Sequence, residues 1–143
     1  MKHITNDIGN IPSHQCWEAL KEANTALIDV RCEEEWKQDG LPDLSSMDKE
    51  AKQITWIHFS PFVHSNNNFI AQLENEIEDK NTKVFFICKS GGRSMQAANA
   101  ALEAGYLNCF NISDGFLGNM FDQNLENLNQ NGWVHNNLPW RKL

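Results

Sequence analysis

The chain of 143 residues has no long apolar run. A membrane-spanning helix needs about 20 mostly apolar residues, so the sequence predicts no membrane segment and no membrane partner. Its first ten residues, MKHITNDIGN, lack the apolar core of a signal peptide. These two absences favour a cytoplasmic location, or the matrix of an organelle if the host has one.

Basic charge and metal-ligand patterns are also scarce. Twelve Lys and Arg face 19 Asp and Glu, and the net charge of −7 disfavours nucleic acid as a partner. None of the four cysteines forms a Cys-x-x-Cys pair, so we expect free thiols in a reducing compartment. The five histidines show no ligand spacing, which predicts no metal site.

What the chain does contain suits a single domain over residues 1–143, since 41% of its residues are hydrophobic. Apolar patterns predict strands at 26–30, 55–59, 84–87 and 109–112, and helices from Ser13, at 32–36, 69–77 and 94–104, and around Leu125 and Leu128. The polar residues 37–53 indicate a long loop. Ser13 is the expected N-cap of the first helix. Alternation of helix and strand predicts an α/β fold, with a mostly parallel sheet covered on both faces.

The stretch most informative about function is residues 84–94, VFFICKSGGRS. An apolar strand ends at Cys88, two glycines follow, and a helical pattern begins at Ser94. A loop that opens a helix points backbone N–H groups inward, and the helix dipole adds positive potential there. A thiol at that position ionises readily, and the thiolate is a nucleophile. Lys89 and Arg93 add positive charge for an approaching anion.

Simpler interpretations exist for each of these residues. Cys88 as a buried core thiol is disfavoured by the neighbouring glycines and arginine. Arg93 could lie on the surface, but its place at the mouth of the loop favours contact with an anion. The run Glu33-Glu34-Glu35 indicates a solvated helix start that the dipole favours.

Several motifs together resemble the rhodanese family of sulfurtransferases. Residues 88–94, CKSGGRS, resemble its active-site loop. Residues 27–31, LIDVR, followed by residues 33–36, EEEW, resemble its first signature, an apolar strand that ends in Asp-Val-Arg and leads to a Glu-Trp. Residues 105–116 resemble the strand and glycine turn after the active-site helix, and 132–140 resemble the tail of single-domain members. The resemblance covers roughly residues 4–141. The segment Gly40 to Asp43, GLPD, departs from the family's usual Gly-His-Ile-Pro-Gly-Ala.

The resemblance implies a rhodanese-like fold with a mostly parallel, five-stranded central sheet. It implies catalytic roles for Cys88 and Arg93 and no cofactor. The remaining active-loop residues, which would bind substrate, are Lys89, Ser90, Gly91, Gly92 and Ser94. In the family, a pair such as Asp29 and Arg31 lies near the loop and helps to hold it.

The implied reaction is sulfur transfer from a small anionic, thiosulfate-like donor through a persulfide on Cys88 to cyanide, a thiol or a thioredoxin-like protein. One alternative is phosphatase or arsenate-reductase-like chemistry, since cell-cycle phosphatases of dual specificity share a similar fold. Those enzymes place five residues between Cys and Arg, whereas only four separate Cys88 from Arg93. Another alternative is a non-catalytic sulfur-carrier or binding domain, but such domains usually lack the cysteine.

Cys32 lies outside the resemblance. In a rhodanese-like sheet the strand ending at Val30 neighbours the strand ending at Ile87, so we expect Cys32 near the Cys88 loop. The simpler interpretation is inert packing. The alternative is a redox partner that condenses with a sulfenic acid on Cys88, which requires Cα atoms within about 7 Å.

Overall fold

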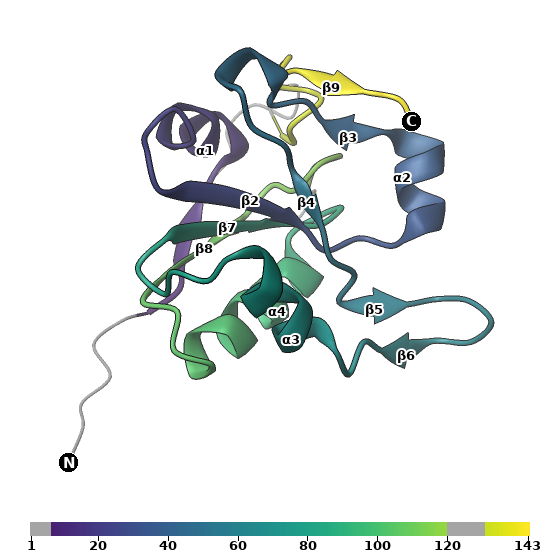
Figure 1. The fold of residues 1–143 in the computed structure, drawn as a ribbon. Coiled ribbons are helices and arrows are strands. Elements are labelled where there is room, and N and C mark those ends of the chain that lie inside the picture. Colours follow the sequence, from purple (N-terminus) through teal and green to yellow (C-terminus); the bar gives the residue numbers. More distant parts are fainter. Residues whose placement is uncertain (1–6, 120–130) are drawn as a thin grey trace.

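The fold centres on a five-stranded, wholly parallel sheet, seen in a computed structural model that describes residues 7–119 and 131–143 (Figure 1). In spatial order its strands are β1 (Gly9–Ile11), β8 (Asn108–Ile112), β7 (Lys83–Ile87), β2 (Thr25–Asp29) and β4 (Lys52–Gln53). Every neighbouring pair is parallel. The expected α/β class and five-stranded parallel sheet are confirmed.

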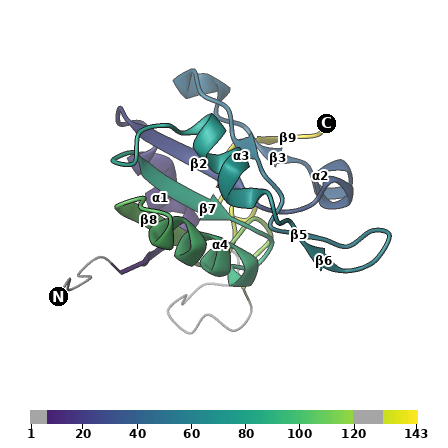
Figure 2. The same cartoon turned by 60° about the horizontal axis from the view of Figure 1, so that its bottom comes forward.

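Helices cover both faces of this sheet. Helices α3 (Phe69–Glu76) and α4 (Gly92–Glu103) lie on one face, and α1 (Ser13–Ala19) lies on the other (Figures 1 and 2). Helix α2 (Glu33–Asp39) lies beyond the carboxyl end of β2. This arrangement leaves that edge of the sheet bordered by α2 and the start of α4.

The strand residues alternate between two apolar cores. Ile28 and Phe86 pack with α3 and α4, whereas Leu27 and Phe85 pack with α1 and with Trp133. Alternation is what a pleated strand imposes when both of its faces are covered, and it explains why β2 and β7 read as continuous apolar runs.

The segment expected to be a loop at 37–53 contains regular structure. It forms β3 (Leu41–Pro42), the 3₁₀ turn η1 (Ser45–Met47) and the edge strand β4. β3 pairs with β9 (Trp140–Arg141), a partner about a hundred residues away that sequence patterning cannot supply.

The strand expected at 55–59 was misplaced. Ile57–His58 forms β5, which pairs with β6 (His64–Ser65) in a separate hairpin, and β4 takes the place beside β2. β4 has only two residues and lies at a sheet edge, so Lys52–Gln53 carries no apolar run to reveal it.

Three helix boundaries also differ from expectation. Ser13 is the first residue of α1 and Pro12 its N-cap, because the Asp114 carboxylate, distant in sequence, accepts the Ser13 N–H at 2.8 Å. Helix α2 extends to Asp39, and α4 begins at Gly92. The helix expected around Leu125 and Leu128 lies outside the described residues.

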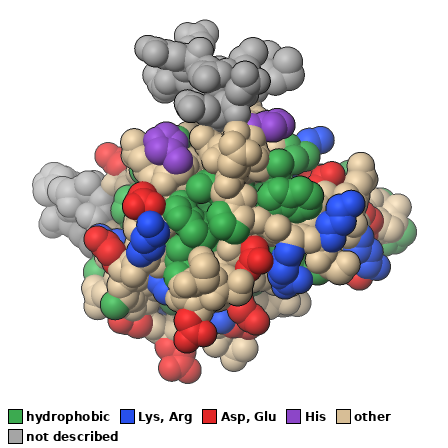
Figure 3. Space-filling model, turned by 90° about the horizontal axis from the view of Figure 1, so that it is seen from above, with side chains coloured by type: hydrophobic (Ala, Val, Ile, Leu, Met, Phe, Trp, Pro, Cys, Tyr) green, Lys and Arg blue, Asp and Glu red, His purple; other side chains and the backbone are tan. Residues whose placement is uncertain are grey.

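No helix among residues 7–119 and 131–143 is long and apolar enough to cross a membrane. On the face shown in Figure 3, acidic and basic side chains of the described residues are interspersed.

Candidate active site

The sheet register brings the ends of β2 and β7 to the same edge. Asp29 lies opposite Ile87, and the Val30 N–H donates to the Ile87 carbonyl at 2.9 Å. The predicted neighbourhood of these two strands is therefore confirmed. Cys88 follows β7 directly, at the point where the chain turns into α4.

The Cys88 thiol lies inside the turn that opens α4. The side chain is 1% exposed, the Gly91 N–H donates to its Sγ at 3.0 Å, and the Ser94 hydroxyl lies 3.2 Å away. Gly91 has φ +103°, and a Cβ there would stand 2.6 Å from the Ser113 carbonyl oxygen, so only glycine fits. The helix N-terminus and the amide together favour negative charge on the sulfur.

Asn111 fixes the orientation of Ser94. Its Nδ2 donates to the Gly91 carbonyl at 3.2 Å, which points Oδ1 at the Ser94 hydroxyl, 2.5 Å away. The Ser94 hydroxyl therefore donates its hydrogen bond to Asn111 and can accept a hydrogen bond from the Cys88 thiol. Asn111 could not be singled out from its sequence context, because its role depends on β8 lying beside β7.

The turn at 115–117 supports the loop from behind. The Phe116 N–H donates to the Cys88 carbonyl at 2.8 Å and the Leu117 N–H to the Lys89 carbonyl at 3.0 Å. Gly115 has φ +65°, and a Cβ there would collide with the Lys89 carbonyl oxygen. Gly115 therefore allows this turn to pack closely against the Cys88 loop, and it belongs to the glycine turn that the family resemblance predicts after the active-site helix.

Arg93 is held by an acidic residue of α2. Its Nη1 and Nη2 donate to the two carboxylate oxygens of Glu35 at 2.6 and 2.8 Å, and its Cζ lies 5.3 Å from the centre of the Phe59 ring. The side chains are only 17% and 16% exposed. The expectation of a solvated Glu33-Glu34-Glu35 run is wrong for Glu35.

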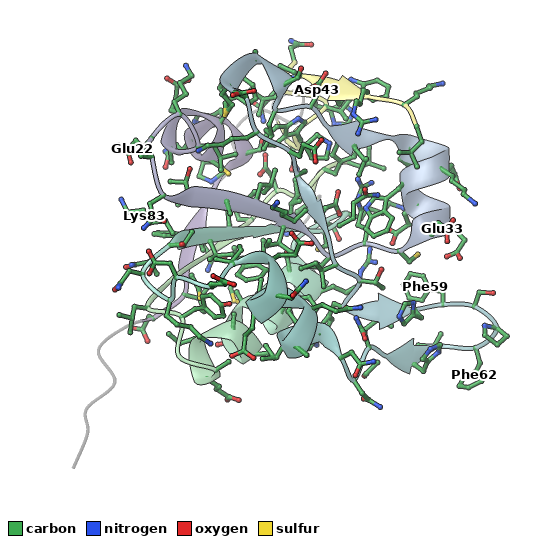
Figure 4. All side chains as sticks on the ribbon, in the orientation of Figure 1. Glu22, Glu33, Asp43, Phe59, Phe62 and Lys83 are labelled. Atoms are coloured by element: carbon green, nitrogen blue, oxygen red, sulfur yellow. The ribbon has the colours of Figure 1, made fainter. Side chains whose placement is uncertain are left out.

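Figure 4 places these elements relative to one another. The β5–β6 hairpin extends from the sheet on the same side as α2, with Phe59 on the part of the hairpin nearer α2 and Phe62 near its tip. Neither Glu35 nor Phe59 could be assigned to the loop from spacing, because each belongs to an element whose position only the tertiary structure defines.

The ion pair also affects the acidity of Glu35. Burial opposes its ionisation, but hydrogen bonds from Arg93 and from the Cys32 N–H, together with the Arg93 charge, outweigh burial and lower its pKa from 4.5 to about 2. A carboxyl with a depressed pKa in the folded state stabilises that state above its unfolded pKa, and this contribution is lost as the pH falls through the folded value.

We therefore expect the stability of the protein to fall more steeply between about pH 4.5 and pH 2 than that of Glu35→Gln. Denaturant titrations of both proteins across this range measure the difference. Parallel profiles would contradict the ion pair's contribution. Glu33→Gln is the matched control, because Glu33 is exposed and its ion pair is with Lys37, which is exposed as well.

Asp29 and Arg31 form a buried pair beneath the site. The Arg31 Nη2 donates to the Asp29 carboxylate at 2.7 Å and to the Gly40 carbonyl at 2.8 Å, and both side chains are fully buried. Arg31 Cζ lies 4.2 Å from the centre of the Phe116 ring. The pair thus reaches the Cys88 loop through Phe116. The supporting role expected for Asp29 and Arg31 stays a prediction.

The other loop residues differ in exposure. Lys89, Ser90 and Gly92 are exposed, whereas Gly91 and Ser94 are buried. Their roles toward a substrate, like that of Arg93, stay predictions. Within residues 7–119 and 131–143 no group of three or more His, Cys, Asp or Glu side chains is placed to hold a metal ion.

Cys32 is the N-cap residue of α2. Its Sγ lies 3.3 Å from a Glu35 carboxylate oxygen, so it is joined to the Cys88 loop through Glu35 and Arg93. Burial, followed by a hydrogen bond with Glu34, raises the pKa of the Cys32 thiol to about 11. All four cysteines are free. The role of Cys32 as a redox partner of Cys88 stays a prediction, and the raised pKa of the Cys32 thiol disfavours that role.

Comparisons with known proteins agree with this fold. The model of the family described as "STR4 middle domain" matches residues 9–143. The chain is 39% identical over 135 residues to "Uncharacterized protein RP600" of Rickettsia prowazekii, covering 94% of this chain and 98% of that protein. It is 26% identical over 134 residues to the rice protein "THYLAKOID RHODANESE-LIKE, chloroplastic", covering 92% of this chain and 25% of that protein.

Two solved structures resemble the whole fold. The crystal structure of Rv0390 from M. tuberculosis has a TM-score of 0.79 and 38% identity, covering 94% of this chain and 98% of that one. The polysulfide-sulfur transferase homodimer from Wolinella succinogenes has a TM-score of 0.64 at 20% identity, covering 95% and 80%. The chain belongs to the STR4 middle domain family, and its fold is rhodanese-like.

Proposed function

We propose that the protein transfers sulfane sulfur from a thiosulfate-like donor to cyanide or a thiol through a persulfide on Cys88. The observation that carries this proposal is the position of the Cys88 Sγ, which accepts the Gly91 N–H at the N-terminus of α4. That environment stabilises a negative sulfur both before and after transfer.

In the first half-reaction the Cys88 thiolate attacks the outer sulfur of thiosulfate. A new Sγ–S bond forms, the donor S–S bond breaks, and its electron pair leaves with sulfite. In the second, the acceptor attacks the terminal sulfur, so that cyanide becomes thiocyanate and Cys88 returns as thiolate. An acceptor thiolate would instead leave as a persulfide. A thioredoxin-like protein is a further acceptor that we propose on the same chemistry.

The Ser94–Asn111 contact adds a switchable hydrogen bond. The thiol donates to Ser94 while Ser94 donates to Asn111. Once Cys88 ionises, rotation of the Ser94 hydroxyl supplies a second donor to the sulfur, alongside the Gly91 amide. This rotation gives up the hydrogen bond from Ser94 to Asn111 in exchange for one to the sulfur.

Phosphoryl chemistry is the competing function, and loop size argues against it. Four residues separate Cys88 from Arg93, and Gly91 already directs its amide to the sulfur within this short turn. A larger loop is needed to surround a tetrahedral phosphoryl group with N–H donors. The Arg93 guanidinium is also engaged by Glu35 rather than directed into the loop.

Inserting one glycine between Gly91 and Gly92 tests this argument. We expect thiosulfate turnover to fall at least about tenfold, because loss of one donor to developing charge costs roughly that or more. Slow hydrolysis of p-nitrophenyl phosphate is expected to appear. The argument fails if the unaltered protein already hydrolyses the phosphate ester faster than it transfers sulfur.

Initial-rate kinetics of thiocyanate formation test the function itself. Varying thiosulfate at several fixed cyanide concentrations should give parallel double-reciprocal lines, since sulfite leaves before cyanide enters. Intersecting lines would exclude a persulfide that forms before the acceptor binds. A protein that forms no thiocyanate under these conditions would refute transfer between this donor and acceptor.

A further inference from the structure

The positive charge of Arg93, beside the Cys88 loop, is balanced by the Glu35 carboxylate on helix α2. Arg93 belongs to the loop, but both of its terminal nitrogens bind the Glu35 carboxylate. Stacking against Phe59 and low exposure keep the guanidinium in that position. The pair carries no net charge while Glu35 is ionised.

This pairing leaves little positive charge for an incoming anion. In the part of the chain that the structure describes, Lys89 is the loop cation without an ion pair, and it is exposed to solvent, where its field is screened. An incoming donor also meets the charge of the Cys88 thiolate. The electrostatic cost of approach therefore rises with each negative charge that the donor carries.

We propose that Glu35 determines which sulfur donors the site prefers. By neutralising Arg93, Glu35 makes the site favour donors with a single negative charge over the thiosulfate dianion. This inference rests on the proposed sulfur transfer and names the class of donor. Glu35 need not touch the donor, because its charge acts on Arg93 and on the potential at the loop.

Thiosulfate and methanethiosulfonate provide a matched pair of probes. In each, the Cys88 thiolate attacks the terminal sulfur, the S–S bond breaks, and the electron pair leaves with sulfite from one donor and with methanesulfinate from the other. Both reactions yield the same persulfide, and the donors differ by one unit of charge.

The test compares kcat/KM for the two donors in wild-type protein and in Glu35→Gln. Glutamine retains an oxygen for the Arg93 hydrogen bond and for the cap on Cys32 but removes the charge. We expect kcat/KM to rise roughly tenfold for thiosulfate and only about threefold for methanethiosulfonate, because a potential acts in proportion to donor charge. The difference should shrink at high salt. Glu33→Gln, which removes the same charge from an exposed position two residues earlier in α2, should change the donor ratio little.

A double variant keeps the test decisive if Glu35→Gln disturbs the fold. Glu35→Gln with Arg93→Gln removes both charges, so the ratio of kcat/KM between the donors should stay within about twofold of wild type, since the net local charge is unchanged. Equal changes for both donors in Glu35→Gln, or a fall for thiosulfate, would overturn the inference while leaving sulfur transfer intact. Failure of wild-type protein to react with either donor would instead refute the proposed function.

Discussion

Cys88→Ser is expected to lower sulfur transfer by at least about a thousandfold while the protein keeps its fold, because a hydroxyl at neutral pH is a far weaker nucleophile than a thiolate. The Sγ is held by the Gly91 amide and lies beside Ser94, and a smaller hydroxyl can still use the same hydrogen bonds. Thiocyanate formation measures the loss, and thermal unfolding measures the retained fold.

Cys109→Ser is the matched control for this substitution. Cys109 is also buried and free, but it lies in β8, where its thiol donates to the Tyr106 carbonyl at 3.7 Å. Its serine variant should keep sulfur transfer close to that of the parent. Undiminished turnover by Cys88→Ser would refute a mechanism with Cys88 as its sole nucleophile.

Asp29→Ala is expected to lower the free energy of unfolding by about 3–5 kcal/mol, because it leaves the buried Arg31 charge without its counter-ion. Asp29 accepts bonds from the Arg31 amide, Nε and Nη2, and neither side chain reaches solvent. A loss of this size is a large share of the total stability of a typical domain. Urea unfolding measures it.

Replacing both partners separates the orphaned charge from lost packing. Asp29→Leu with Arg31→Met removes the charge pair together, and should recover at least about half of the stability lost in the single variant. If the double variant is as unstable as Asp29→Ala, the loss does not come from an unpaired Arg31. Activity should fall along with stability in Asp29→Ala, since Arg31 supports Phe116 behind the Cys88 loop.

The central strands and the loop were predictable because their signals are local. β7 and β2 are buried on both faces and read as apolar runs, of which β2 ends at Asp29 and β7 is followed by Cys88. Cys88, Gly91 and the start of α4 follow β7 within a few residues, so the sequence order itself predicts a thiol at a helix N-terminus. The parallel pairing of β2 with β7 followed from the family resemblance.

The parts that escaped prediction depend on contacts between distant segments. β1 and β4 contain three and two residues, too short to show a period, and they become strands because β8 and β2 offer open edges. Glu35 belongs to the expected Glu-Trp signature, but the sequence predicted it to be solvated like Glu33 and Glu34. Only the packing of α2 beside the loop singles it out, since its carboxylate meets Arg93 across 58 positions of sequence.

The most direct measurement of the central claim is the intact mass of the protein after brief exposure to thiosulfate, followed by peptide mapping. The proposed mechanism predicts a gain of one sulfur atom, located on the peptide that contains Cys88, released by cyanide and absent from Cys88→Ser. A protein that transfers sulfur yet gains no sulfur atom, or carries it on Cys16, Cys32 or Cys109, would contradict a Cys88 persulfide.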